Sequence, residues 1–394
     1  MNPLAPPPSP PGPAAGAPRT GNDPSLPRSA YFVGPVTDFL AVGGAALMVF
    51  ALFLALPRLA TAPAVGWLVA VGLWVCNYPH FASTNYRLYS SRTSRRAYPA
   101  TAWLTPALLL AAVVACFLRP ATAADLVLIY FLWSPYHYSA QAMGVAMVYS
   151  RRCGLDLTRA ERRVLAGLSQ VSFVTATAHI QADRHTYHYF GVAYTGLGIP
   201  GLVPRLLDVV LWASLLAVAA VIARRALTGR RMIPFIVLLP LITQFLWSTA
   251  ATPGYYAVII PFFHCLQYLF IAWNYQLAVA AAAPDRRRST RFAVTETARW
   301  AALNAALGFA LFWCLPYAGH VLGRSLAFST AVILAAVQIH HFFVDGVIWK
   351  LRAPSTRQPL MSTLSDVAGR APRARPSGRA LAALAAGASV DPDL

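Results

Sequence analysis

Ten apolar segments, each close to the length of a membrane-spanning helix, constrain the fold of this chain more than any other feature. A helix needs about 20 mostly apolar residues to cross the hydrocarbon core of a bilayer. Only 11% of the residues are charged, against about 25% in a soluble domain. The predicted spans are 36–56, 63–85, 101–118, 124–149, 163–182, 205–223, 232–250, 255–278, 298–318 and 325–349. We therefore predict an all-α fold, a polytopic membrane helical bundle with about ten transmembrane helices.

Two segments without an apolar core flank this bundle. Residues 1–30 are rich in proline and alanine, a composition that cannot bury enough apolar surface to fold. Residues 353–394 carry several arginines and are likewise predicted to be a disordered, basic tail. The transmembrane helical domain is predicted to cover residues 31–352, and both tails are predicted to be cytoplasmic.

The arginines between the spans indicate the topology. They concentrate in alternate loops, at 87–96, 151–163, 224–231 and 286–291. The positive-inside rule places such loops in the cytoplasm, so we predict a multi-pass protein of a bacterial inner (plasma) membrane with both termini cytoplasmic. The net charge of +19 then needs no nucleic-acid partner, because loop arginines face anionic lipid headgroups of the bilayer.

Histidines on four of these spans are the strongest functional signal. They are His80, His137, His264 and the adjacent pair His340 and His341. An imidazole in hydrocarbon has lost its water and needs a partner, so each is a candidate functional residue. Because they recur on spans two, four, eight and ten, we predict that they surround one metal ion, with either member of the pair as the fourth ligand.

Polar residues accompany these histidines at helical spacing. Asp345 follows His341 by four residues and therefore shares its helix face. A carboxylate commonly accepts a hydrogen bond from the outer nitrogen atom of a metal-bound histidine, and we predict this role for Asp345. The other residues predicted to support the ligands are Gln141, Gln267 and Tyr268. No catalytic residue is assigned beyond this set.

The residue types favour iron as the metal. Four imidazoles that leave coordination positions open suit Fe²⁺, and zinc or copper less well. The chain has no Glu-x-x-His pattern, which argues against a di-iron carboxylate centre. It also has no phosphate-binding or dinucleotide-binding glycine motif. His185 and His188 lie in a polar loop, where we expect solvent-tolerated side chains rather than ligands.

Four short windows resemble the bacterial β-carotene 15,15'-dioxygenases, the Brp/Blh family. That family carries PHGxxD, HFGxxD, HSxxH and PHxxxxD on successive spans. Similar windows here are Pro79-His80, His137-Tyr138, FFHCLQYLFIAW at 262–273, and His340-His341 with Asp345. The resemblance implies oxidative cleavage of a carotenoid to retinal at a histidine-bound iron.

The chain departs from those motifs at three positions. Thr84 stands near the acid of the first motif, and Gln141 replaces the acid of the second. Tyr268 replaces the second histidine of the third motif, so a fourth ligand would have to come from the His340/His341 pair.

Three functions remain open from the sequence. The first is a membrane oxidoreductase whose iron acts on a carotenoid or another long apolar lipid. The second is a transporter or a proton or metal conduit that uses the intramembrane histidines. The third is a non-catalytic membrane partner protein, and the oligomeric state is equally open.

Overall fold

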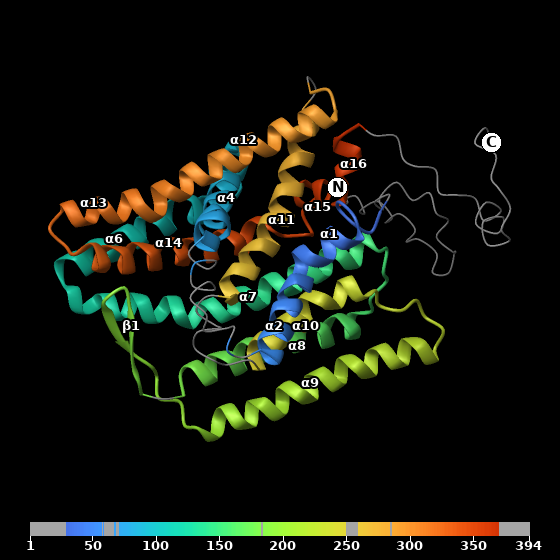
Figure 1. Ribbon diagram of the computed structural model, residues 1–394, viewed down its shortest axis with the longest axis horizontal. Helices are drawn as coiled ribbons and strands as arrows, with labels where there is room; N and C mark the ends of the chain where they lie inside the picture. The colour runs from blue at the N-terminus through green and yellow to red at the C-terminus, as the bar shows by residue number, and fades with distance from the viewer. Residues whose placement is uncertain are drawn as a thin grey trace, which may run out of the picture.

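The computed structural model describes residues 29–56, 58, 67, 71–182, 184–249, 259–283 and 286–369, and these are mostly helical. Of the tails predicted for residues 1–30 and 353–394, residues 1–28 and 370–394 lie outside the described residues. In Figure 1, α12 and α13 form one edge of the bundle and α9 forms the opposite edge. The helices α4, α7, α11 and α14 lie between these edges.

In its described part, the first half of the chain contains seven α-helices and four short π-helical or 3₁₀ segments. These elements are α1 (Pro35–Phe39), η1 (Leu40–Gly44), α2 (Ala45–Ala55), η3 (Leu73–Asn77), α4 (Tyr78–Tyr89), α5 (Arg92–Ala97), η4 (Ala100–Leu104), α6 (Thr105–Leu118), η5 (Pro120–Thr122), α7 (Ala123–Arg152) and α8 (Arg159–Ile180).

A short antiparallel hairpin separates the halves, where the sequence predicted a loop. Its strands are β1 (Thr186–Tyr189) and β2 (Val192–Thr195), paired with Tyr189 opposite Val192. The remaining elements are α9 (Leu202–Leu227), α10 (Phe235–Thr249), α11 (Ile260–Ala281), α12 (Thr290–Phe309), η7 (Ala310–Cys314), α13 (Leu315–Val321), α14 (Leu326–Ile348), α15 (Pro354–Arg357), η8 (Pro359–Met361) and α16 (Leu364–Val367).

Five helical segments in the described part are long and apolar enough to cross a membrane, which makes this a multi-pass membrane protein by length and composition. They are Pro35–Ala55, Ala100–Leu118, Leu202–Leu227, Thr290–Val321 and Leu326–Ile348. Ten spans are not shown. The helices α4, α7, α8 and α11 carry polar side chains on buried faces, which lowers their mean hydropathy.

Side-chain caps explain where three of the long helices begin. Thr158, Ser289 and Ser325 precede α8, α12 and α14 and accept a hydrogen bond from a backbone N–H in the first turn. Such a cap satisfies one of the donors that a helix start leaves unpaired. The Glu161 side chain completes a capping box at the start of α8.

Residues 353–369 form short helices packed against the bundle, so the predicted disordered tail does not extend over them. Leu360 is fully buried, and the Arg152 guanidinium donates hydrogen bonds to the carbonyl oxygen atoms of Leu360 (2.6 Å) and Ser362 (3.0 Å). The same guanidinium donates to Tyr31 (2.7 Å), which ties the N-terminal segment to the C-terminal one. This order could not be predicted from the sequence, because a short polar segment can fold by contacting a buried partner such as Arg152.

Candidate metal centre

The structure brings four of the predicted histidines to one point. His80 comes from α4, His137 from α7, His264 from α11 and His341 from α14. One ligand atom from each lies within 4.8 Å of the others. All four side chains are buried, with relative exposures between 0% and 5%.

A π-helical turn or a proline precedes three of these histidines. The π-helical η3 leads directly into α4, two residues before His80. Pro135 sits inside α7 and removes one backbone hydrogen bond two residues before His137. Pro261 lies in the first turn of α11, three residues before His264. Departures from regular α-helix are frequent at functional sites, because they re-aim a side chain toward a shared centre.

The nitrogen atoms are spaced like neighbouring ligands of one ion. The Nε2 atom of His341 lies 2.8 Å from Nε2 of His80 and 3.0 Å from Nε2 of His137. Two ligands at right angles, each about 2.1 Å from an ion, lie about 3.0 Å apart. Hydrogen bonds alone explain both contacts poorly, since one imidazole nitrogen has either one proton or one lone pair. A cation that accepts lone pairs from all these atoms resolves the conflict.

His264 supplies an independent test of this fit. Its side chain is 2% exposed, and both of its ring nitrogen atoms lack a hydrogen-bond partner. A buried polar atom without a partner costs about 1–3 kcal/mol. Its ring lies against those of His80 and His137, with centroids 5.1 and 4.9 Å away. The residues present therefore fit a metal ion, although they do not identify which metal.

Asp345 faces the same centre. Its Oδ2 atom lies 3.4 Å from Nε2 of His341 and 3.9 Å from Nε2 of His137. Its Oδ1 atom accepts hydrogen bonds from Thr84 and Tyr268, each at 3.2 Å. We expected Asp345 to bind the outer nitrogen atom of His341, but Nδ1 of that residue has no hydrogen-bond partner. The carboxylate instead lies on the inner side, where its charge would act directly on a cation held by the histidines.

Thr84 is the supporting residue to which the sequence analysis gave no role. It also contacts the Tyr268 hydroxyl, so Thr84, Tyr268 and Asp345 form one hydrogen-bonded group. The available signal was its position four residues after His80, on the same face of α4.

Gln141 and Gln267 join helices rather than histidine side chains. The Gln141 amide donates to the Gln267 side chain (3.0 Å) and to the backbone carbonyl of His264 (2.9 Å). Gln267 in turn donates to the carbonyl of Val42 at 2.6 Å. The pair therefore holds α7, α11 and the first helical segment together at the level of the cluster.

His340 lies outside the cluster. Its ring stacks on Tyr89, whose hydroxyl lies 3.3 Å from Nε2 of His340. Neighbouring residues on a helix point about 100° apart, so only one of the pair can face the centre, and that one is His341. His185 and His188 are not part of the four-histidine group either, and His188 belongs to β1 of the hairpin.

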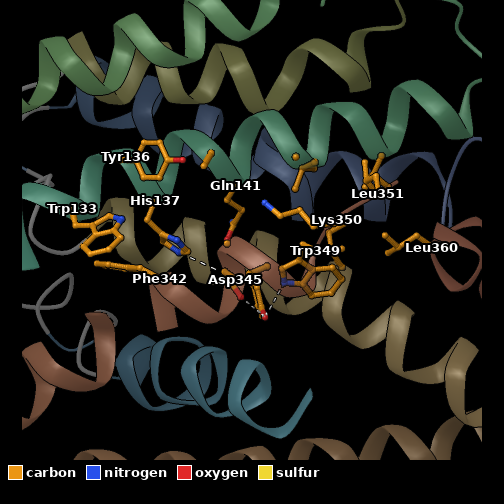
Figure 2. Close-up of a pocket in the computed structure, with 17 residues that line it drawn as sticks. Trp133, Tyr136, His137, Gln141, Phe342, Asp345, Trp349, Lys350, Leu351 and Leu360 are labelled. Atoms are coloured by element: carbon orange, nitrogen blue, oxygen red, sulfur yellow. Dashed lines mark hydrogen bonds and ion pairs between the residues drawn. The ribbon is translucent and has the colours of Figure 1, made fainter. Parts of the chain in front are cut away.

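Two cavities reach the cluster and share His137 and Phe342 in their walls. One, of about 260 Å³, is lined largely by aromatic residues, including Tyr138, Tyr189 and Phe312, and also touches His264. The other, of about 280 Å³, is drawn in Figure 2 and runs from His137 past Gln141 and Asp345 to Lys350.

Comparison of the chain with protein-family models, with curated proteins and with solved structures found no match. No family is therefore assigned. What the structure defines is a class: a helical, multi-pass membrane protein with a buried four-histidine group that could hold a metal ion.

Proposed function

We propose that the four histidines bind an iron ion and that the protein is an integral membrane oxidoreductase. Its reaction would be the oxygen-dependent oxidation or cleavage of a long apolar lipid, such as a carotenoid. The observation that carries this proposal is the convergence of four buried imidazoles, one of which has no other partner for either nitrogen atom.

The ligand chemistry favours a first-row transition metal such as iron over magnesium or calcium. Imidazole suits zinc, copper, iron and nickel, whereas magnesium and calcium prefer oxygen ligands. The nearby Asp345 carboxylate adds an oxygen atom to the nitrogen set. An iron ion, when bound, supplies the oxygen and electron-transfer chemistry that amino-acid side chains lack.

The protein's own residues would hold and shield this centre. Phe342 stacks on His137 with ring centroids 4.6 Å apart, and Phe81 packs edge-on against His341 at 4.7 Å. Tyr138 lies 4.4 Å from the ring of His264. These aromatic walls exclude water from the imidazoles, and the Gln141–Gln267 pair fixes the separation of α7 and α11.

The cavities supply room for an apolar chain. The aromatic cavity extends from His264 toward Tyr189 and Phe190 in the hairpin, and its walls suit the packing of a polyene or acyl chain. His137 lies in the walls of both cavities, so a substrate in either would lie beside the cluster.

We also propose that this protein resides in a bacterial inner membrane with both termini in the cytoplasm. The support is the concentration of arginine in alternate loops.

Expression in carotenoid-producing cells tests the reaction. Wild-type protein should form retinal or another cleavage product, and His264→Ala should abolish it. His340→Ala is the matched control, because it removes a neighbouring buried imidazole that lies outside the cluster. Unchanged pigment together with bound iron would redirect the proposal to another lipid.

A purified protein without metal would contradict the enzyme proposal. The continuous contacts from His80 through His341 to His137 would then favour proton or cation conduction, and a non-catalytic partner role would also remain. Proton flux in liposomes, measured for wild type and His341→Ala, would distinguish these two alternatives.

A further inference from the structure

The cavity in Figure 2 is lined by α7, α11 and α14 and is only partly enclosed, and exposed lining residues on the α7 and α14 sides locate its opening. Among its lining residues, those exposed on α7 are Tyr136, Ala140 and Gly144, which are spaced four residues apart. On the α14 side the exposed lining residues are Gly346, in the last turn of α14, and Lys350, which follows the helix. The spacing on α7 puts its three residues on one face of that helix, and together with Gly346 and Lys350 they border what we call the α7–α14 slot.

Small residues keep this slot open. A Cβ atom added at Gly144 or at Gly346 would meet nothing within 4 Å. Because α14 is a candidate membrane span by length and composition, we place the opening along its side against lipid rather than water. The slot therefore connects the bilayer with the cavity that ends at His137 and Asp345.

Lys350 lies at the interfacial end of the slot. It is the single lysine among 32 basic residues of the chain and follows the end of α14 by two residues. In Figure 2 its ammonium group points along the cavity toward Gln141. No acidic group in the described part of the chain forms an ion pair with it.

The cavity's own acid does not neutralise this lysine. Both oxygen atoms of Asp345 face other groups, Oδ1 toward Thr84 and Tyr268 and Oδ2 toward the histidines. The Oε1 atom of Gln141 also lacks a hydrogen-bond partner. The cavity thus presents a free cation at its interfacial end and an unused acceptor further in.

We propose that the α7–α14 slot admits a single-chain lipid with an acidic head, a long-chain carboxylate, from the bilayer. Its head would bind Lys350 at the interface, and its chain would extend toward His137. A volume of about 280 Å³ corresponds to about nine groups the size of water. That space takes part of one acyl chain. The inference rests on the proposed function and narrows its substrate class.

Binding can be measured without turnover. Native mass spectrometry of protein released from neutral-lipid nanodiscs would count bound stearate and, separately, stearyl alcohol of equal chain length. Lys350→Gln should weaken stearate binding about tenfold or more, as expected for a lost charge-assisted hydrogen bond, and should leave the alcohol unchanged. Arg352→Gln is the matched control, because it removes an exposed positive charge two residues away that does not line the cavity.

Blocking the slot tests the route. Gly144→Phe and Gly346→Phe should weaken binding of both ligands. Gly167→Phe in α8 should not, since a Cβ there also meets open space but the residue lies outside the cavity. The inference would be overturned if Lys350→Gln left stearate binding unchanged, or if Arg352→Gln weakened it as much as Lys350→Gln. It would also be overturned if neither Gly144→Phe nor Gly346→Phe weakened stearate binding.

Failure of the proposed function would be visible separately. Metal content and oxygen uptake are measured on the same samples. Wild-type protein that binds stearate but contains no iron would contradict only the proposed function. Intact iron with no head-group preference would contradict only this inference.

Discussion

Replacement of Asp345 by asparagine removes a negative charge beside the proposed ion while preserving the shape of the side chain. The carboxylate Oδ2 atom lies 3.4 and 3.9 Å from the Nε2 atoms of His341 and His137. Two unit charges about 4 Å apart attract by about 4 kcal/mol at an effective dielectric constant of about 20. Thr84 and Tyr268 already donate hydrogen bonds to Oδ1, which offsets part of that charge. We therefore expect iron affinity to fall about 10–100-fold, the range seen for residues that support metal ligands.

Competition with a coloured chelator measures this affinity on purified protein. Asp208→Asn is the matched control. Asp208 pairs with His179 at a distance of 2.8 Å, and neither residue belongs to the four-histidine group. A change of less than about twofold in Asp345→Asn, with the helical circular dichroism preserved, would refute a cation beside this carboxylate. An equal loss in Asp208→Asn would show that the effect is not local.

Two further predictions concern stability and topology. Hydrogen bonds from Arg225 lower the pKa of Glu161 to about 2, below an unfolded value of about 4.3, so this ion pair should stabilise the protein fully above that value and lose its effect as the pH falls toward 2. In thermal unfolding, Glu161→Gln should be less stable than wild type by up to about 3–5 kcal/mol at pH 7, because it leaves the buried Arg225 charge without its partner. Near pH 2 the two proteins should differ little in stability. A stability difference that stays constant between pH 7 and pH 2 would contradict the assignment. A cysteine introduced at His185 should react with a membrane-impermeant reagent from the outside, and reaction only from the cytoplasm would invalidate the proposed topology.

The helical architecture could be predicted because the lengths of the apolar segments and the positions of the arginines between them can be read from the sequence. The ten-segment prediction placed helices correctly wherever those segments are described, yet five satisfy the criterion for a membrane span. The difference arises in helices such as α7 and α11, whose polar residues serve the interior. Hydropathy alone cannot separate a polar span buried in a bundle from a helix outside the membrane.

The metal site was predictable in its residue types but not in its details. Histidine recurrence identified His80, His137 and His264, whereas the choice between His340 and His341 depends on the rotation of α14. The spacing of four residues places Asp345 on the His341 face of α14, but the side from which the carboxylate approaches the histidine depends on the crossing angles of the helices. The role of Thr84 likewise depends on contacts between α4, α11 and α14 that no local pattern encodes.

Metal content of the purified protein is the most direct test of the central claim. Plasma mass spectrometry should find about one iron ion per wild-type chain and per His340→Ala chain. His137→Ala and His264→Ala should contain little iron while retaining helical circular dichroism. Equal iron in all four proteins, or no metal in the wild type after purification in the presence of iron, would contradict the proposed four-histidine iron centre.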